Sequence, residues 1–217
     1  MIHNSLEDKI QQFGNPVEML RNAQAGPYQF PIKSEFTNWR DEQEAWRQSA
    51  VFFDQSYHMT DHYIEGPDVK KLVESLAINS MANFRKDVAK QLVVCNSDGY
   101  VIGDAIMFVL EDNLINIVNK PICGNWVQFH AETHSFDVEI NKDDRSLDNS
   151  QPRKGYRFEV QGPNAWSILE KLNGGLISDI KFFNMGEINI AGRKVRVLRH
   201  GMAGAAGLEP PSDTFAH

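Results

Sequence analysis

Cysteine, positive charge and long hydrophobic runs are all scarce in this chain of 217 residues. Its two cysteines, Cys95 and Cys123, are too few for a disulfide framework or a four-cysteine zinc site, and we expect both in the core. The 22 Lys and Arg residues are outnumbered by 29 Asp and Glu residues, and the net charge of −7 disfavours non-specific nucleic-acid binding. No apolar run reaches the roughly 18 residues of a membrane-spanning helix. Acidic residues near the N-terminus disfavour a signal peptide. We therefore expect a cytoplasmic protein without a nucleic-acid or membrane partner.

Hydrophobic residues (41%) and charged residues (24%) occur in the proportions of a globular protein with a hydrophobic core. Apolar periodicity and turn residues predict helices over residues 6–22 (interrupted near Pro16), 38–48, 69–76, 123–134 and 164–172. They predict strands over residues 49–54, 57–65, 91–95, 100–110, 114–118, 136–140, 156–161, 187–190 and 194–199. Helices and antiparallel hairpins in two units, joined by a polar connection, indicate the α+β class.

Two short patterns could indicate a metal site or a phosphate-binding site, but the sequence favours neither interpretation. His58 and His62 share one face of an expected strand while Asp61 points to the other, so a zinc site lacks ligands on one face. The glycine-rich residues 201–207 lack the Lys-Ser/Thr pair of a phosphate-binding loop, and no helix follows them. A tight turn is the favoured interpretation of that stretch, and no metal is expected.

Seven separated segments, each weak alone, together resemble the folate-dependent aminomethyltransferase family, which includes the T-protein of glycine cleavage. In the family's order they are Ala50-Val-Phe-Phe-Asp54, Tyr57-His-Met59, Gly66-Pro-Asp68, Asn96-Ser-Asp-Gly-Tyr-Val-Ile-Gly-Asp104, Ile117-Val-Asn119, Val160-Gln-Gly-Pro-Asn164 and residues 199–209. Further segments are most similar to the tetrahydrofolate-dependent O-demethylases of vanillate- and syringate-type aromatic acids: residues 17–22, 38–40, 53–55, 143–146 and 181–185.

This resemblance implies two α+β units of the cloverleaf fold of the family. Residues 1–48 with 147–209 would form a discontinuous, incomplete folate-binding unit, and residues 49–146 a second unit. The implied activity is tetrahydrofolate-dependent methyl transfer, most like O-demethylation of a methoxylated aromatic acid, with the methyl group passed to N5 of tetrahydrofolate. The partners would then be this cofactor and a small-molecule methyl donor. An aminomethyltransferase-like protein with another one-carbon donor remains an alternative.

The resemblance also assigns cofactor-binding roles. Glu209 falls where the family places an acid against the pterin ring, whose adjacent N–H groups a carboxylate can accept with charge assistance. Asn119, Gln161 and Gly162 match positions that line the folate.

Substrate-binding positions are implied at Tyr28, Phe30, Gln55, His58 and Lys120. Lys120 stands where the demethylases carry Arg, so a point charge replaces a bidentate clamp, and Phe30 stands where they carry Tyr. The departing phenolate needs an acid, and His58 titrates nearest neutral pH. Asp104, in the hairpin whose acid functions in the aminomethyltransferases, is the second catalytic candidate; a plain hairpin residue is the competing interpretation.

The C-terminal segment departs from the family pattern. Pro210 and Pro211 follow the Gly-Leu-Glu segment, so we expect no return strand there, and residues 210–217 have no likeness to the family. The resemblance therefore covers an N-terminal portion, with the C-terminal β-rich unit missing. Three hypotheses follow. The chain could be completed by a missing C-terminal half or by an oligomer partner, or it could be a truncated non-catalytic remnant that binds folate or a partner.

Overall fold

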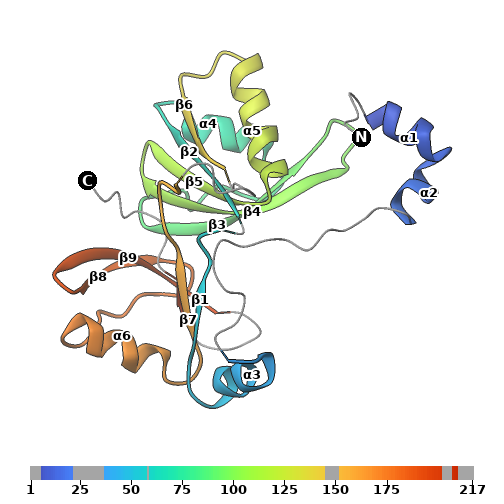
Figure 1. The fold of residues 1–217 in the computed structure, drawn as a ribbon. Helices are drawn as coiled ribbons and strands as arrows, with labels where there is room; N and C mark the ends of the chain where they lie inside the picture. The colour runs from blue at the N-terminus through green and yellow to red at the C-terminus, as the bar shows by residue number, and fades with distance from the viewer. Residues whose placement is uncertain (1–5, 22–36, 58, 145–151, 202–206, 210–217) are drawn as a thin grey trace.

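The computed structural model describes residues 6–21, 37–57, 59–144, 152–201 and 207–209. Two five-stranded antiparallel sheets dominate it, each covered by helices, as Figure 1 shows. This arrangement confirms the α+β class predicted from the sequence. Two short helices, α1 (Leu6–Phe13) and α2 (Pro16–Arg21), precede both sheets and contact each other.

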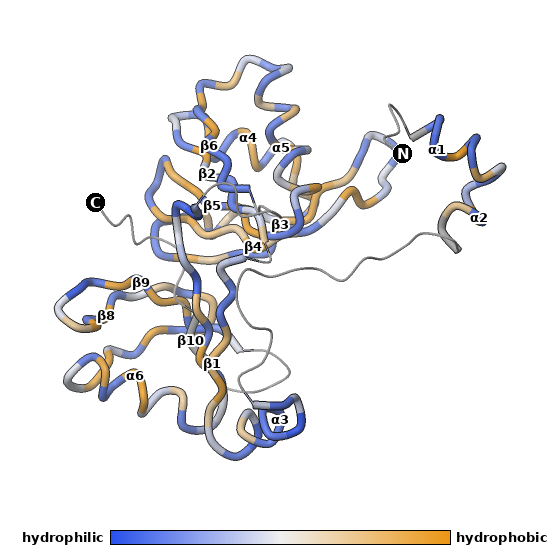
Figure 2. Tube along the Cα trace, viewed as in Figure 1, coloured by the Kyte–Doolittle hydropathy of each residue, from blue (hydrophilic) through white to orange (hydrophobic). Residues whose placement is uncertain are grey.

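The first sheet has the strand order β1-β7-β10-β9-β8. Its strands are β1 (Val51–Asp54), β7 (Phe158–Gln161), β8 (Met185–Ile190), β9 (Arg193–His200) and β10 (Gly207–Glu209). Helix α6 (Ala165–Asn173) contacts β8 and β10, and α3 (Trp39–Gln48) contacts β1. The core between α6 and this sheet contains Val160, Leu169, Ile188 and Val197. In the hydropathy view α6 carries apolar stretches, whereas α3 is polar over most of its length (Figure 2).

The second sheet has the strand order β3-β4-β5-β2-β6. Its strands are β2 (Thr60–Glu65), β3 (Val88–Cys95), β4 (Val101–Glu111), β5 (Leu114–Asn119) and β6 (Glu139–Asp143). Two helices, α4 (Val69–Leu76) and α5 (Pro121–Thr133), enclose the largest hydrophobic cluster against it. Helix α5 contacts β4, β5 and β2, and its first turn lies beside the start of β4, since a Cβ on Gly103 would be 3.5 Å from Cys123 Cβ.

A third hydrophobic cluster joins the two sheets. Phe108 and Val118 of the second sheet pack with Met185 and Leu198 of the first. Backbone hydrogen bonds add to this contact, since the amide of Ala89 donates to Phe183 O at 2.9 Å. The sheets are therefore fixed against each other by packing and by backbone bonds.

Two sequence predictions need correction. Residues 51–54 were expected to open the second unit, but β1 pairs with β7 and so belongs to the first sheet. Hydrophobic pattern identifies a strand without specifying its partner, which explains this error. The prediction that no return strand forms is also wrong, because Gly207–Glu209 forms β10 between β7 and β9. The wider division into residues 1–48 with 147–209 and residues 49–146 stays a prediction.

Within the described ranges, no helix is both long and apolar enough to cross a membrane.

Candidate functional site

A buried acid lies between two of the predicted site residues in the first sheet. Gln55 directly follows β1, and its Nε2 donates to Glu159 Oε2 at 2.7 Å. Gln161 Nε2 donates to the other carboxylate oxygen, Oε1. His200 of β9 approaches the same Oε1, with its Nδ1 at 4.0 Å. The predicted substrate residue Gln55 and the predicted cofactor residue Gln161 thus share one carboxylate.

Strand alternation explains why these polar groups lie together. Glu159 and Gln161 are two residues apart on β7, so they point to one face, while Val160 between them joins the apolar core under α6. Glu159 is 2% exposed and Gln161 is 0% exposed. Buried polar side chains on a strand cost free energy unless they are hydrogen-bonded, so a polar face of this kind is typical of a functional site.

Gln161 Oε1 is buried and has no hydrogen-bond partner among the described residues. Its own Nε2 is committed to Glu159, so the group presented at this position is an acceptor. An N–H or O–H donor of a bound ligand would satisfy it, whereas leaving it unpaired costs roughly 1–3 kcal/mol.

A second group of predicted residues lies at the end of β5. Asn119 Oδ1 accepts the backbone N–H of Lys120 at 2.7 Å, and Asn119 Nδ2 donates to the backbone carbonyl of Asp104. The Asn119 side chain therefore ties β4 to the start of α5. The Asp104 carboxylate, exposed on β4, accepts from Gln91 Nε2 at 2.7 Å.

Lys120 occupies the N-cap position of α5, with Pro121 following it, and makes no side-chain cap hydrogen bond. The first backbone N–H groups of a helix lack intrahelical partners and carry partial positive charge. An exposed ammonium group at this end gives a position where an anionic group is favoured. Cys123, in the first turn of α5, is buried. Burial is the main cause that raises the pKa of its thiol to about 12, and the nearby Asp104 charge is the second, so this thiol stays neutral.

The packing around Gly162 requires glycine at this position. Its φ of +124° disfavours other residues, and a Cβ there would lie 2.5 Å from the carbonyl oxygen of Ser49. The chain can therefore pass close beneath Ser49 between β7 and α6. The predicted folate contact of Gly162 stays a prediction beside this role.

Three predicted site residues, Tyr28, Phe30 and His58, lie outside the described residues. Glu209 is described as backbone only: it ends β10 and pairs with Leu198 of β9. Its strand lies directly beside β7, where Gly207 pairs with Gln161. The structure thus groups Gln55, Gln161 and the Glu209 strand on the first sheet, and Asp104, Asn119 and Lys120 on the second.

No metal-binding group of three or more His, Cys, Asp or Glu side chains occurs in the part of the chain that the structure describes. His62 instead packs beneath α5, with its Nε2 and Asn125 Oδ1 3.2 Å apart. Burial is the largest cause that lowers the pKa of this histidine.

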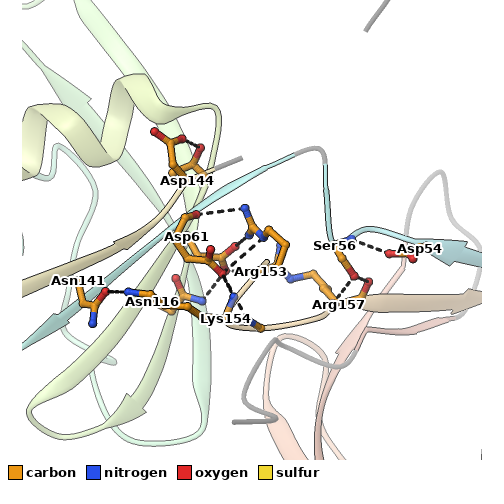
Figure 3. Close-up of polar contacts among 12 residues, drawn as sticks. Asp54, Ser56, Asp61, Asn116, Asn141, Asp144, Arg153, Lys154 and Arg157 are labelled. Atoms are coloured by element: carbon orange, nitrogen blue, oxygen red, sulfur yellow. Dashed lines mark hydrogen bonds and ion pairs between the residues drawn. The ribbon is translucent and has the colours of Figure 1, made fainter. Parts of the chain in front are cut away.

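Asp61 belongs to a buried ionic network at the junction of the sheets, which sequence reasoning missed. Arg153 Nη2 and Arg157 Nη2 donate to its two oxygens at 2.5 and 2.6 Å (Figure 3). Asn116 Nδ2 adds a third bond at 2.8 Å, and Asp143 Oδ2 lies 3.5 Å from Arg153 Nε. Arg153 lies in the polar segment before β7, which has no periodicity to mark it, and Arg157 directly precedes β7, where alternation alone does not show that it is buried.

Comparison with known proteins finds likeness along nearly the whole chain. The profile described as the GCVT N-terminal domain matches residues 12–210. A syringate O-demethylase from Sphingobium sp. strain SYK-6 is 46% identical over 94% of this chain and 45% of its own length. An aminomethyltransferase from Lysinibacillus sphaericus is 30% identical over 85% of this chain and 48% of its own. The chain therefore spans about half the length of the curated relatives it matches.

Two of the matching solved structures illustrate the shared fold. The glycine cleavage system aminomethyltransferase T from Bartonella henselae aligns with a TM-score of 0.61 and 18% identity, over 78% of this chain and 44% of its own. A chain of the heterotetrameric sarcosine oxidase from Corynebacterium sp. U-96 aligns with a TM-score of 0.51 and 11% identity, over 81% of this chain and 84% of its own.

Proposed function

Since this chain belongs to the GCVT N-terminal domain family, we propose that it carries the folate-binding part of an enzyme for tetrahydrofolate-dependent one-carbon transfer. The observation that carries this proposal is the family match over residues 12–210. The buried acceptor Gln161 Oε1 on β7 supports it, because a pterin ring presents adjacent N–H donors to a protein.

In this proposal, Gln161 and Glu209 supply acceptors for the pterin, and the strands β7 and β10 that carry them pair directly. Tetrahydrofolate supplies N5 as the atom that receives the one-carbon unit. The chain's own residues would bind and orient the two reactants, a contribution that can amount to about 7–11 kcal/mol of a barrier when geometry is ideal.

For the methyl donor we propose a methoxylated aromatic acid, supported by the 46% identity with the syringate O-demethylase. Lys120 at the start of α5 would bind the donor carboxylate as a point charge. Gln55 would contact the aromatic ring substituents, and His58 or Asp104 would hold the proton that the departing phenolate oxygen takes up. The ether oxygen would keep the electrons of its bond to the methyl group and take up that proton, while tetrahydrofolate, when bound, would supply N5 as the methyl acceptor, with the N5 proton released to water.

A second candidate is aminomethyl or other one-carbon transfer, supported by the 30% identity with an aminomethyltransferase. The exposed Asp104, in the hairpin formed by β3 and β4, would then be the principal acid. A third candidate is a non-catalytic module that binds folate or a partner; the chain spans 45% of the length of the demethylase it matches.

Methyl transfer from a syringate labelled with ¹³C in its methoxy groups separates these candidates. The chain is incubated with tetrahydrofolate and the labelled acid, and the products are followed by NMR. Appearance of the label in 5-methyltetrahydrofolate, with loss of the signal in Gln161→Ala, supports O-demethylation. Transfer from an aminomethyl donor alone favours the second candidate, and folate binding without any transfer favours the third.

A further inference from the structure

We propose that Glu159, which lies outside the segments that carry the family resemblance, is a positioning residue that couples the binding of the methyl donor to the binding of tetrahydrofolate. The inference rests on the proposed function and extends it from the predicted contact residues to the acid that holds them. Its basis is that Glu159 uses one oxygen for Gln55 Nε2, at 2.7 Å, and the other for Gln161 Nε2.

The charge of the Glu159 carboxylate determines how the side-chain amides of Gln55 and Gln161 are oriented. An ionised carboxylate can only accept hydrogen bonds, so each glutamine must turn an N–H toward it. The amide oxygens are then directed elsewhere, and Gln161 Oε1 is the buried acceptor without a partner among the described residues. A neutral amide at position 159 could donate as well as accept, and the orientation of both glutamines would no longer be specified.

The position of Glu159 in the sheet makes it a link between two chain segments. Gln55 follows β1, and its backbone N–H donates to Arg157 O at 2.8 Å. Gln161 lies on β7 between Val51 of β1 and Gly207 of β10. A ligand that orders one glutamine therefore acts on the same carboxylate that holds the other.

Burial makes this shared carboxylate sensitive to both neighbours. Glu159 is 2% exposed, and in such surroundings hydrogen bonds to a charged group are stronger than in water. When one ligand orders its glutamine, the second ligand meets a carboxylate and an amide already in place, which gives positive cooperativity. The coupling is expected to be reciprocal and of about fivefold to 100-fold.

The test compares Glu159→Gln with Glu187→Gln, an exposed acid on β8 whose partner is the exposed Lys194. Tetrahydrofolate affinity is measured by calorimetry with and without saturating syringate. In the wild type and in Glu187→Gln, syringate should tighten tetrahydrofolate binding by about fivefold or more. In Glu159→Gln this factor should fall to about one while both ligands still bind. An undiminished factor in Glu159→Gln overturns the proposal.

A ligand-free measurement separates this proposal from the proposed function. Side-chain amide signals of Gln55 and Gln161 are assigned by ¹H–¹⁵N NMR with Gln55→Ala and Gln161→Ala. Both signals should shift in Glu159→Gln and stay in place in Glu187→Gln. Unchanged signals in Glu159→Gln overturn the positioning role, even where folate binds. If Glu159→Gln shows these shifts but the wild type binds no tetrahydrofolate, the proposed function and the coupling are both overturned, and only the orientation of the two amides stands.

Discussion

Arg157 Nη2 lies 2.6 Å from Asp61 Oδ1, with both side chains buried, and this contact joins the segment that precedes β7 of the first sheet to β2 of the second. The Arg157 guanidinium also lies over the Phe108 ring, 5.8 Å from its centroid, inside the cluster between the sheets. Because Arg153 holds the other oxygen of Asp61, a single carboxylate fixes two arginines of the connecting segment.

Removing that carboxylate should cost much of the stability of the chain. Asp61→Ala removes the carboxylate that both buried guanidinium groups contact, and breaking a buried ion pair in this way costs about 3–5 kcal/mol. Urea unfolding at neutral pH measures the change. Glu74→Ala, which removes the exposed pair with Lys70 on α4, should change stability by less than about 1 kcal/mol. Equal effects of the two variants would contradict the role of the network.

Gly124 should tolerate no side chain, because of the histidine beneath it. A Cβ on this helical glycine would lie 2.1 Å from His62 Nδ1, so Gly124→Ala forces the imidazole or α5 to move. We expect a loss of about 1–3 kcal/mol in urea unfolding, against the gain of about 1 kcal/mol that alanine usually brings to a helix.

Two further variants control for this effect. Gly175→Ala has open space around its Cβ and should be close to neutral. His62→Ala in the Gly124→Ala background removes the clash, so the cost of Gly124→Ala should shrink there. An equal cost in both backgrounds would show that the imidazole is not the obstacle.

Stability should fall as the pH falls through the range of histidine titration. Burial lowers the pKa of His62 in the folded state, so the unfolded chain binds the proton at higher pH than the folded chain. The contribution of neutral His62 to the free energy of unfolding is complete above the unfolded-state pKa of about 6.5, and it is lost progressively below that pH. Urea midpoints measured from about pH 8 to about pH 5 should decline, and less steeply in His62→Gln. Burial also lowers the pKa of His130, so some decline remains. An unchanged slope in His62→Gln would contradict this assignment.

Lys120 should affect the binding of the donor more than the binding of folate. Lys120→Met removes the cation at the start of α5, and affinity for syringate should fall by about tenfold, as a lost charge-assisted contact predicts. Lys120→Arg should restore or improve it through a bidentate contact. Calorimetry with both ligands checks this, with Lys70→Met on α4 as the control. Unchanged syringate affinity in Lys120→Met would remove this residue from the site.

Much of the fold could be predicted from local sequence. Helix α4 has the predicted bounds because Gly66, Pro67 and Asp68 mark its start and the apolar positions recur at helical spacing. The partner of β1 could not be predicted, since strand pairing depends on residues more than a hundred positions away. For the same reason β10 was missed: three residues before a proline become a strand only because β7 and β9 leave a place between them.

Motifs in the sequence indicated candidate site residues, whereas contacts that depend on burial could not be predicted. The resemblance assigned binding roles to Gln55 and Gln161, which stay predictions, and the structure adds that Glu159 connects their side chains. Polar residues at alternate positions 157, 159 and 161 were the available signal, but alternation alone more commonly indicates a solvent-facing side of a strand. Only the structure shows that this polar side is buried.

Tetrahydrofolate binding by the 217-residue chain tests the central claim most directly. Calorimetric titration should give saturable binding at one site per chain, weakened about tenfold or more by Gln161→Ala, because the buried acceptor on β7 would be lost. The exposed Glu187→Gln variant should bind like the wild type. No binding up to millimolar tetrahydrofolate, or equal binding by the wild type and Gln161→Ala, would contradict the account.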